Sequence, residues 1–275
     1  IHTLVKFGAN VNAQNRHWQT PLFFAAQMGH VDVIHALVKY QPNVNARDSS
    51  NKTPLFFAAK RGHIDVIHAL VKFGANVNVQ DRRKETPLSF AADMGHVETI
   101  YTLNGYGAYI FTKNILHETP LFLAARRGHA EAIFAFISLV NITKATFCSQ
   151  SNELTKETYF NFGNGKKEAP MHIAAKNGHY KAIRALVGYR TDEGSKDGYG
   201  ADDSEDGYGA DVDSENENGQ PRFTKVVKFK ATRPLFRYRY KAKVNTVTRD
   251  GQTPLHAAAQ NGHINAILTL SDCGA

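Results

Sequence analysis

The feature that most constrains the fold is a tetrapeptide, Thr-Pro-Leu followed by Phe or Ser, that recurs every 33 residues. It begins at Thr20, Thr53, Thr86 and Thr119, and related tetrapeptides begin at Ala169 and Thr253. Each copy is followed by Ala-Ala, two variable residues and Gly-His. A fixed period of this length predicts a stack of small units, because none of them can bury its apolar face alone.

The copy that begins at Thr53 shows how one unit encodes two helices. We expect the Thr53 hydroxyl to cap the first helix by accepting a hydrogen bond from an amide of its first turn. Pro54 suits the first helical position, and Gly62 is expected to end the helix in a left-handed conformation. A second helix should then bury the apolar stripe formed by Ile64, Ile67, Leu70 and Val71.

These motifs resemble the ankyrin repeat, whose signature is Thr-Pro-Leu-His-x-Ala-Ala, then Gly-His and later Gly-Ala-x-Val-Asn. The resemblance covers nearly the whole chain and implies an all-α fold, an α-solenoid of helical pairs joined by hairpin loops. It also implies a concave side formed by hairpin tips and first helices. Ankyrin proteins usually bind protein partners on that side.

The repeat frame divides the chain into seven segments. Both ends break off within a repeat, so we interpret the chain as a fragment of a longer protein. The segments are a partial repeat at 1–15, regular repeats at 16–139, an insert at 140–168, a repeat at 169–191, an acidic insert at 192–219, a degenerate repeat or strand-like basic segment at 220–248, and a truncated repeat at 249–275.

The two segments between 192 and 248 depart most from the frame. Between Asp192 and Glu217 there are 11 acidic residues and one basic residue, which predicts a disordered insert. Pro221 precedes Pro254 by 33 residues, as a degenerate repeat would require. Residues 236–244 alternate with period two, however, which favours a strand. Both alternatives stay open on the sequence.

Composition excludes several classes of protein. The sequence has no run of 18 apolar residues, so we expect no membrane-spanning helix. Its two cysteines, Cys148 and Cys273, lie far apart, which indicates a reducing, cytoplasmic compartment and no disulfide scaffold. The histidines recur at the repeat length, as structural residues would. We therefore expect no metal and no cofactor, and no catalytic motif indicates an enzyme.

The positions that vary within the constant frame are the candidate partner-binding residues. Arginine dominates them, and arginine and tryptophan are enriched at binding hot spots. We expect a protein partner with an acidic or mixed surface, bound by a monomeric array within a larger protein. A solvated basic face without a partner is the alternative. The candidates are Arg16, His17, Trp18, Gln27, Met28, Arg47, Lys52, Lys60, Arg61, Arg82, Arg83, Met94, Lys113, Ile115, Leu116, Arg126 and Arg127.

The basic and aromatic segment 222–243 supports a second function. Bases interleaved with aromatic residues can bind single-stranded nucleic acid, or an anionic membrane surface. We favour a third interpretation, in which the aromatic residues pack in the stack and the bases neutralise the acidic insert. Asn45 and Asn78 occupy a position that is hydroxylated in some ankyrin proteins, although bracing of the hairpin explains them equally well.

Overall fold

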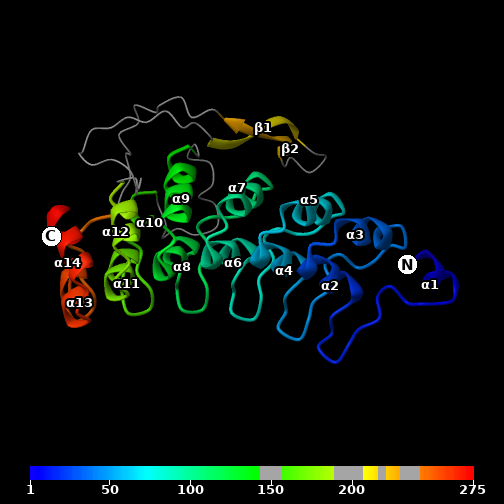
Figure 1. The fold of residues 1–275 in the computed structure, drawn as a ribbon, viewed down its shortest axis with the longest axis horizontal. Helices are drawn as coiled ribbons and strands as arrows, with labels where there is room; N and C mark the ends of the chain where they lie inside the picture. Colours follow the sequence, from blue (N-terminus) through cyan, green and yellow to red (C-terminus); the bar gives the residue numbers. More distant parts are fainter. Residues whose placement is uncertain (143–155, 189–206, 216–220, 230–241) are drawn as a thin grey trace. The chain divides into compact units, whose positions relative to one another are not determined.

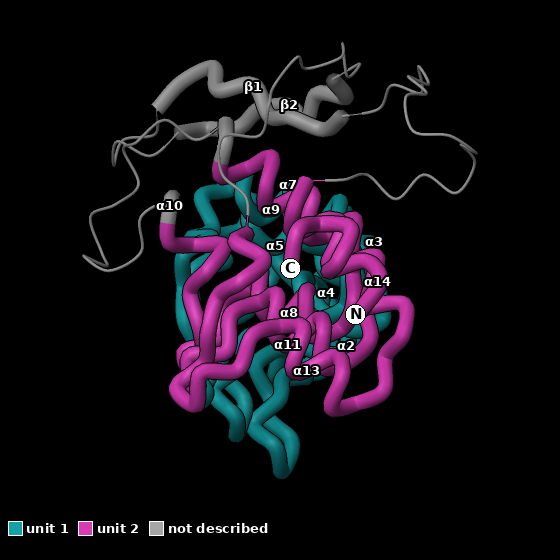
Figure 2. Tube along the Cα trace, turned by 90° about the vertical axis from the view of Figure 1, so that its left-hand side faces the viewer, with its two compact units in different colours: residues 1–115, 212–224 teal, residues 116–211, 225–275 magenta. Residues whose placement is uncertain are grey.

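The structure is a computed structural model that describes residues 1–142, 156–188, 207–215, 221–229 and 242–275. The chain divides into two compact units, residues 1–115 with 212–224, and residues 116–211 with 225–275 (Figure 2). Each unit is built from pairs of short helices joined by hairpin loops (Figure 1). The helical repeat array expected from the sequence is confirmed.

The first unit contains two rows of helices. First helices α2, α4 and α6 pack on one another, and second helices α3, α5 and α7 form the other row (Figure 1). Leu22, Leu55 and Leu88 of the first helices are fully buried between the rows. The helices are α1 (His2–Lys6), α2 (Pro21–Met28), α3 (Val31–Val38), α4 (Pro54–Arg61), α5 (Ile64–Lys72), α6 (Pro87–Met94) and α7 (Val97–Gly105).

The second unit repeats this plan. Helix α11 packs on both α8 and α13, and helix α12 packs on both α9 and α14. The short helix α10 contributes Tyr159, whose buried hydroxyl interacts with Thr119. The helices are α8 (Pro120–Arg127), α9 (Ala130–Ile142), α10 (Lys156–Tyr159), α11 (Pro170–Lys176), α12 (Tyr180–Leu186), α13 (Pro254–Gln260) and α14 (Ile264–Asp272).

The long step between the last two repeats is closed by one backbone hydrogen bond. Elsewhere the Ala75 amide donates to the Leu70 carbonyl at 2.9 Å, five residues back. In the second unit the Ala242 amide donates to the Leu186 carbonyl at the same distance. The step from Ala169 to Thr253 is 84 residues, 51 more than one period of 33. The chain therefore leaves the frame after Leu186 and rejoins it at Ala242.

Two strands are described within this long step. Strands β1 (Gly207–Glu215) and β2 (Pro221–Phe229) form a two-stranded sheet. Strand β1 lies in the acidic insert, for which composition predicts no regular structure; Tyr208, Ala210 and Val212 alternate there with period two. Strand β2 lies at 221–229, whereas the strand alternative was drawn from the alternation at 236–244, of which residues 236–241 lie outside the described residues. The rest of both segments, up to residue 241, lies outside the described residues.

The threonine caps differ from expectation in two repeats. Thr53 occupies the N-cap of α4, but its side chain makes no capping hydrogen bond, so that prediction is wrong. Among the described residues, the hydroxyls of Thr20 and Thr53 are buried without a hydrogen-bond partner. The residue three positions later is phenylalanine in both repeats. In α6 that residue is Ser89, whose hydroxyl contacts Thr86 Oγ1 at 3.1 Å.

Each Gly-His pair joins neighbouring repeats. Gly62 ends α4 with φ 72°, so the left-handed cap expected from the sequence is confirmed. A Cβ atom there would lie 3.2 Å from the ring of His96 in the next repeat. Nε2 of His96 in turn donates to the Lys60 carbonyl at 3.0 Å. The same contact recurs for Gly29 with His63, Gly128 with His179, and Gly178 with His263.

The imidazole ring of His172, at the start of α11, is neutral. Its Nδ1 accepts from the Ala169 amide at 3.2 Å, and its Nε2 donates to the Gln252 carbonyl at 3.0 Å. Both nitrogens are satisfied only when the single ring proton is on Nε2. Burial lowers the pKa of His172, because a charged imidazolium would be poorly solvated at this position.

Removal of the unpaired Thr53 hydroxyl tests the cap assignment. Thr53→Val should leave the free energy of unfolding unchanged or raise it by up to about 1 kcal/mol, because no hydrogen bond is lost. Thr86→Val breaks a capping box and should cost about 1 kcal/mol. Urea denaturation of both variants measures the difference. Equal losses would show that Thr53 has a partner after all.

Alanine at two glycine caps separates backbone strain from the histidine contact. Gly262 has φ 71°, and a Cβ atom there meets nothing within 4 Å. Gly262→Ala should therefore cost only the left-handed penalty, about 1 kcal/mol. Gly62→Ala should cost clearly more, because the ring of His96 must also move. Chemical denaturation compares the two, and a Gly62 variant no worse than the Gly262 variant would refute the contact.

Acid should destabilise the second unit through His172. The pKa of His172 in the folded chain lies below the ordinary value of 6.5. The unfolded chain is therefore protonated at a higher pH than the folded chain, and protonation favours unfolding. Stability is then lost as the pH falls below about 6.5. Phenylalanine occupies the same position in α4 as Phe56, so His172→Phe should flatten the decline in unfolding free energy between pH 7.5 and 5.5. An unchanged slope would contradict the assignment.

Candidate functional site

The hairpin tips are joined to one another by backbone hydrogen bonds. Each tip donates an amide to a carbonyl of the preceding tip, so the tips cannot move independently. In the first unit the bonds run from Ser49 to His17 at 2.9 Å, from Arg82 to Ser50 at 3.2 Å and from Ile115 to Arg83 at 2.9 Å. In the second unit they run from Gly165 to Leu116 at 3.1 Å and from Arg249 to Lys166 at 3.4 Å.

A side-chain carboxylate or amide shapes four of the tips from inside. Asp81 Oδ1 accepts from the amides of Arg83 at 2.8 Å and Glu85 at 2.9 Å. This group was not among the predicted residues, although an Asn or Asp five residues before the tetrapeptide is a recurring signal. The others with the same pair of bonds are Asn15, Asp48 and Asn164.

Five tips also contain a residue with positive φ that is not glycine. Trp18 has φ 63° and a side chain that is 58% exposed. The bulky indole thus occupies a conformation that favours glycine. The equivalent residue in the last repeat is Gly251, with φ 74°. The other four residues are Asn51, Lys84, His117 and Lys167.

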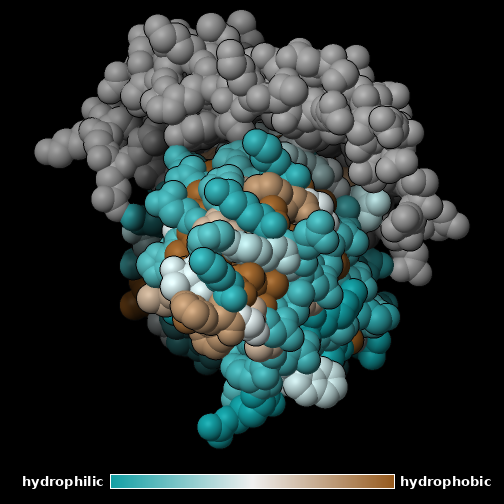
Figure 3. Space-filling model, turned by 90° about the vertical axis from the view of Figure 1, so that its right-hand side faces the viewer, coloured by the Kyte–Doolittle hydropathy of each residue, from teal (hydrophilic) through white to brown (hydrophobic). Residues whose placement is uncertain are grey.

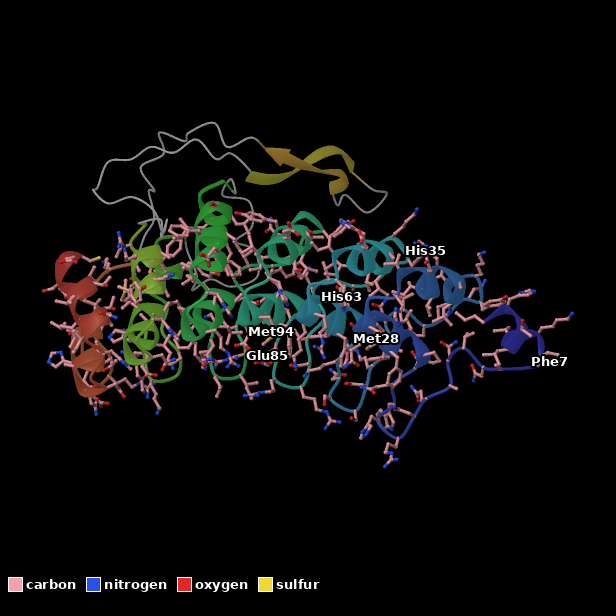
Figure 4. All side chains as sticks on the ribbon, in the orientation of Figure 1. Phe7, Met28, His35, His63, Glu85 and Met94 are labelled. Carbon is pink, nitrogen blue, oxygen red and sulfur yellow. The ribbon has the colours of Figure 1, made fainter. Side chains whose placement is uncertain are left out.

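Most of the predicted partner-binding residues are exposed on the tips and first helices. Figure 4 shows Met28, Glu85 and Met94 on the side of the first helices and His35 on the side of the second helices. In the first unit the exposed residues are Arg16, His17, Trp18, Met28, Arg47, Lys60, Arg61, Arg82, Arg83 and Ile115, and the half-buried ones are Gln27, Lys52, Met94 and Lys113. In the second unit Leu116 and Arg127 are exposed.

Arg126 is already held by an internal ion pair. Its Nη1 lies 2.9 Å from Oε1 and 3.1 Å from Oε2 of Glu118, a buried carboxylate. The Arg126 carbonyl also accepts from Nε2 of His179 at 3.0 Å. Burial makes such a pair costly to break on one side only. This residue therefore braces its own repeat, which the sequence pattern could not distinguish from a partner contact.

The first unit also exposes apolar side chains near α2. Trp18, Phe24 and Met28 are 58%, 47% and 62% exposed. Phe24 and Met28 line a groove of about 680 Å³. On the face that Figure 3 shows, apolar surface gathers at the centre with hydrophilic side chains around it. Phe24 was not predicted as a partner-binding residue. Its counterpart in the next repeat, Phe57, packs edge-on against Phe23, as a structural residue would.

Asn45 and Asn78 brace neighbouring hairpins. Asn45 Oδ1 accepts from the Asn76 amide at 2.9 Å, and its Nδ2 donates to the Gly74 carbonyl at 2.9 Å. Asn78 makes the equivalent bonds to Tyr109 and Gly107. Both ends of each amide group are thus used, which accounts for these residues structurally.

The described residues contain no group of three or more His, Cys, Asp or Glu side chains that could hold a metal ion. The described helices include none that is both long and apolar enough to cross a membrane. Most of the basic and aromatic segment 222–243 lies outside the described side chains. The predicted binding of nucleic acid or an anionic surface by this segment therefore concerns residues outside the described part of the chain.

Comparison with protein families gives matches across both units. A model described as ankyrin repeats in three copies matches residues 1–81, 36–114 and 88–197, and a model described as a single ankyrin repeat matches residues 250–275. Comparison with curated proteins gives no match. The matched residues cover well over half of the chain and include the stacked helices. The chain belongs to the ankyrin repeat family.

Proposed function

We propose that this chain is a non-catalytic interaction module that binds a protein partner through its hairpin tips and first helices. Ankyrin repeats are generally protein–protein interaction modules. The observation that carries the proposal is the row of tips, whose backbones are bonded to one another while their outward side chains vary. A rigid frame lowers the entropic cost of binding, since little of the surface must be ordered.

The chemistry of the tips favours a partner with an acidic or mixed surface. Arg16, Arg47, Arg82 and Arg83 are exposed there, and guanidinium groups bind carboxylates in two-pronged geometry. The formal net charge of +8 would steer acidic partners toward the chain. Trp18 adds an apolar anchor of the type that dominates binding energy. Nucleic-acid binding through 222–243 gains no comparable support.

The proposal includes a setting for this interaction. A sequence with only two widely spaced cysteines suits a reducing compartment, so we assign the module to the cytoplasm. We further propose that it acts as a single array within a larger protein. Any catalytic activity would then belong to another part of that protein.

Trp18→Gly separates partner binding from folding. Glycine relieves the left-handed backbone, so the melting temperature should stay the same or rise, while loss of the indole should weaken partner binding at least tenfold. The Lys167→Gly variant relieves the same conformation without removing a candidate contact, and serves as the matched control. Proteins captured by the immobilised chain are quantified for both variants and for the Arg82→Glu, Arg83→Glu double variant.

The control should retain the captured proteins, and the other two variants should lose them. Undiminished capture by both the Trp18 variant and the double variant would show that binding takes place elsewhere. Loss of capture together with a lowered melting temperature would point to unfolding instead, and would count against the assigned backbone strain.

A further inference from the structure

A small pocket lies among three neighbouring hairpin tips of the second unit. Its volume is about 280 Å³, and the residues that line it include His117, Phe162, Asn164, Lys167 and Arg249. Pockets that hold a whole small molecule have volumes of about 300–1,000 Å³. This pocket is therefore of a size for one side chain of a partner. None of its lining residues was predicted to bind a partner.

Each of the three tips contributes one basic side chain to the pocket. They are His117 before α8, Lys167 before α11 and Arg249 before α13, and all three are exposed. Among the residues that the structure describes, none of these three side chains forms a hydrogen bond or an ion pair. Three basic groups thus share one small pocket with their donors unused.

An acidic residue follows each basic residue in the sequence, yet none of these acids lines the pocket. Glu118 Oε1 lies 2.9 Å from Arg126 Nη1, and Glu168 Oε1 lies 3.4 Å from Lys176 Nζ. The third acid, Asp250, is exposed. The positive charge of the pocket is therefore not balanced by a carboxylate in its described wall.

The amide side chain of Asn164, also in the wall, is already used by the loop itself. Its Oδ1 accepts from the Lys166 and Glu168 amides, both at 3.0 Å, and its Nδ2 donates to Glu168 Oε2 at 2.8 Å. The polar capacity that remains in the described wall therefore belongs to the three basic donors. Such a wall fits an anion that offers several acceptor oxygens.

Backbone hydrogen bonds hold the three tips in place before any ligand binds. The Gly165 amide donates to the Leu116 carbonyl at 3.1 Å, and the Arg249 amide donates to the Lys166 carbonyl at 3.4 Å. The backbones that carry the three basic side chains are thus joined in one row. Little of the loop structure has to be ordered on binding, which lowers the entropic cost.

We propose that this pocket binds a phosphorylated side chain of the protein partner. A phosphate monoester carries a charge of about −1.5 to −2 at pH 7 and offers three strong acceptor oxygens. Three donors on three tips can meet these oxygens, and the guanidinium of Arg249 can bind two of them at once. A carboxylate has a single charge and two oxygens, so it leaves part of the wall unpaired. This inference rests on the proposed function and adds phosphorylation of the partner to it.

The first arm of the test selects peptides on the whole chain. The source is a synthetic library of peptides of about 12 residues with phosphoserine fixed at the centre and random residues elsewhere. Selected peptides are made again with phosphoserine, glutamate or serine at that position, and their binding is measured by fluorescence anisotropy. The phosphoserine forms should bind at least tenfold more tightly than both other forms.

The second arm compares two double variants that remove the same charge. Lys167→Gln with Arg249→Gln changes the pocket, whereas Lys166→Gln with Arg184→Gln changes exposed residues outside its wall. The pocket variant should bind the phosphoserine peptides at least tenfold more weakly, with binding of the serine peptides unchanged. The control variant should keep the preference for phosphoserine. Both melting temperatures should match that of the original chain, because the altered side chains are exposed.

Several results would overturn this inference and leave the interaction module intact. Among them are peptides that bind equally well with serine, equal losses in both double variants, and failure to select any peptide while protein capture still depends on Trp18. A lowered melting temperature of the pocket variant would count against it too, since its side chains would then have partners within the chain. Inorganic phosphate or a single-stranded oligonucleotide that binds as tightly as the phosphoserine peptides would show that the ligand is not a protein.

Treatment of the captured proteins with phosphatase separates this inference from the proposed function. Capture that depends on Trp18 does not need phosphate, so it should persist after treatment. Because Lys167 belongs to the pocket, the Lys167→Gly control for Trp18 is run on treated proteins. Failure to select any peptide, together with no captured protein, would overturn both proposals.

Discussion

Within each of the two units, neighbouring repeats meet through a contact between a histidine ring and the glycine of the preceding repeat. The ring of His96 lies against Gly62, and its Nε2 bonds to the Lys60 carbonyl. A Cβ atom at Gly62 would lie only 3.2 Å from the ring, so the ring would have to shift, and the side chain would also strain the left-handed backbone. Because this contact recurs within each unit, the repeats of a unit meet one another in a similar way. The bonded row of hairpin tips depends on that geometry.

The repeat frame could be predicted from the sequence because the residues that form it recur at a fixed spacing. Gly62 recurs as a glycine in all six copies and was assigned correctly. Thr53 recurs as well, yet its hydroxyl makes no cap, whereas the Thr119 hydroxyl accepts from the Phe122 amide in the same sequence context. The closing bond from Ala242 to Leu186 joins residues far apart in sequence, and no local pattern indicates it.

The candidate surface was only partly predictable, for a related reason. Variable positions in a constant frame identified the exposed tips, including Trp18. They could not show that Arg126 is bound to Glu118, because an arginine in the last turn looks the same with or without a partner. The contact between positions eight residues apart, as in Glu118–Arg126 and Glu168–Lys176, became visible only in the structure.

The junction between Leu186 and Ala242 makes the array permissive to foreign sequence. The hydrogen bond that closes it holds the two ends of the excursion close together, and the entropy of closing a flexible loop grows only by about 0.6 kcal/mol for each doubling of its length. A change in the length of the connection between α12 and α13 should therefore cost little free energy. The same tolerance gives evolution a place to attach new activities to an unchanged scaffold.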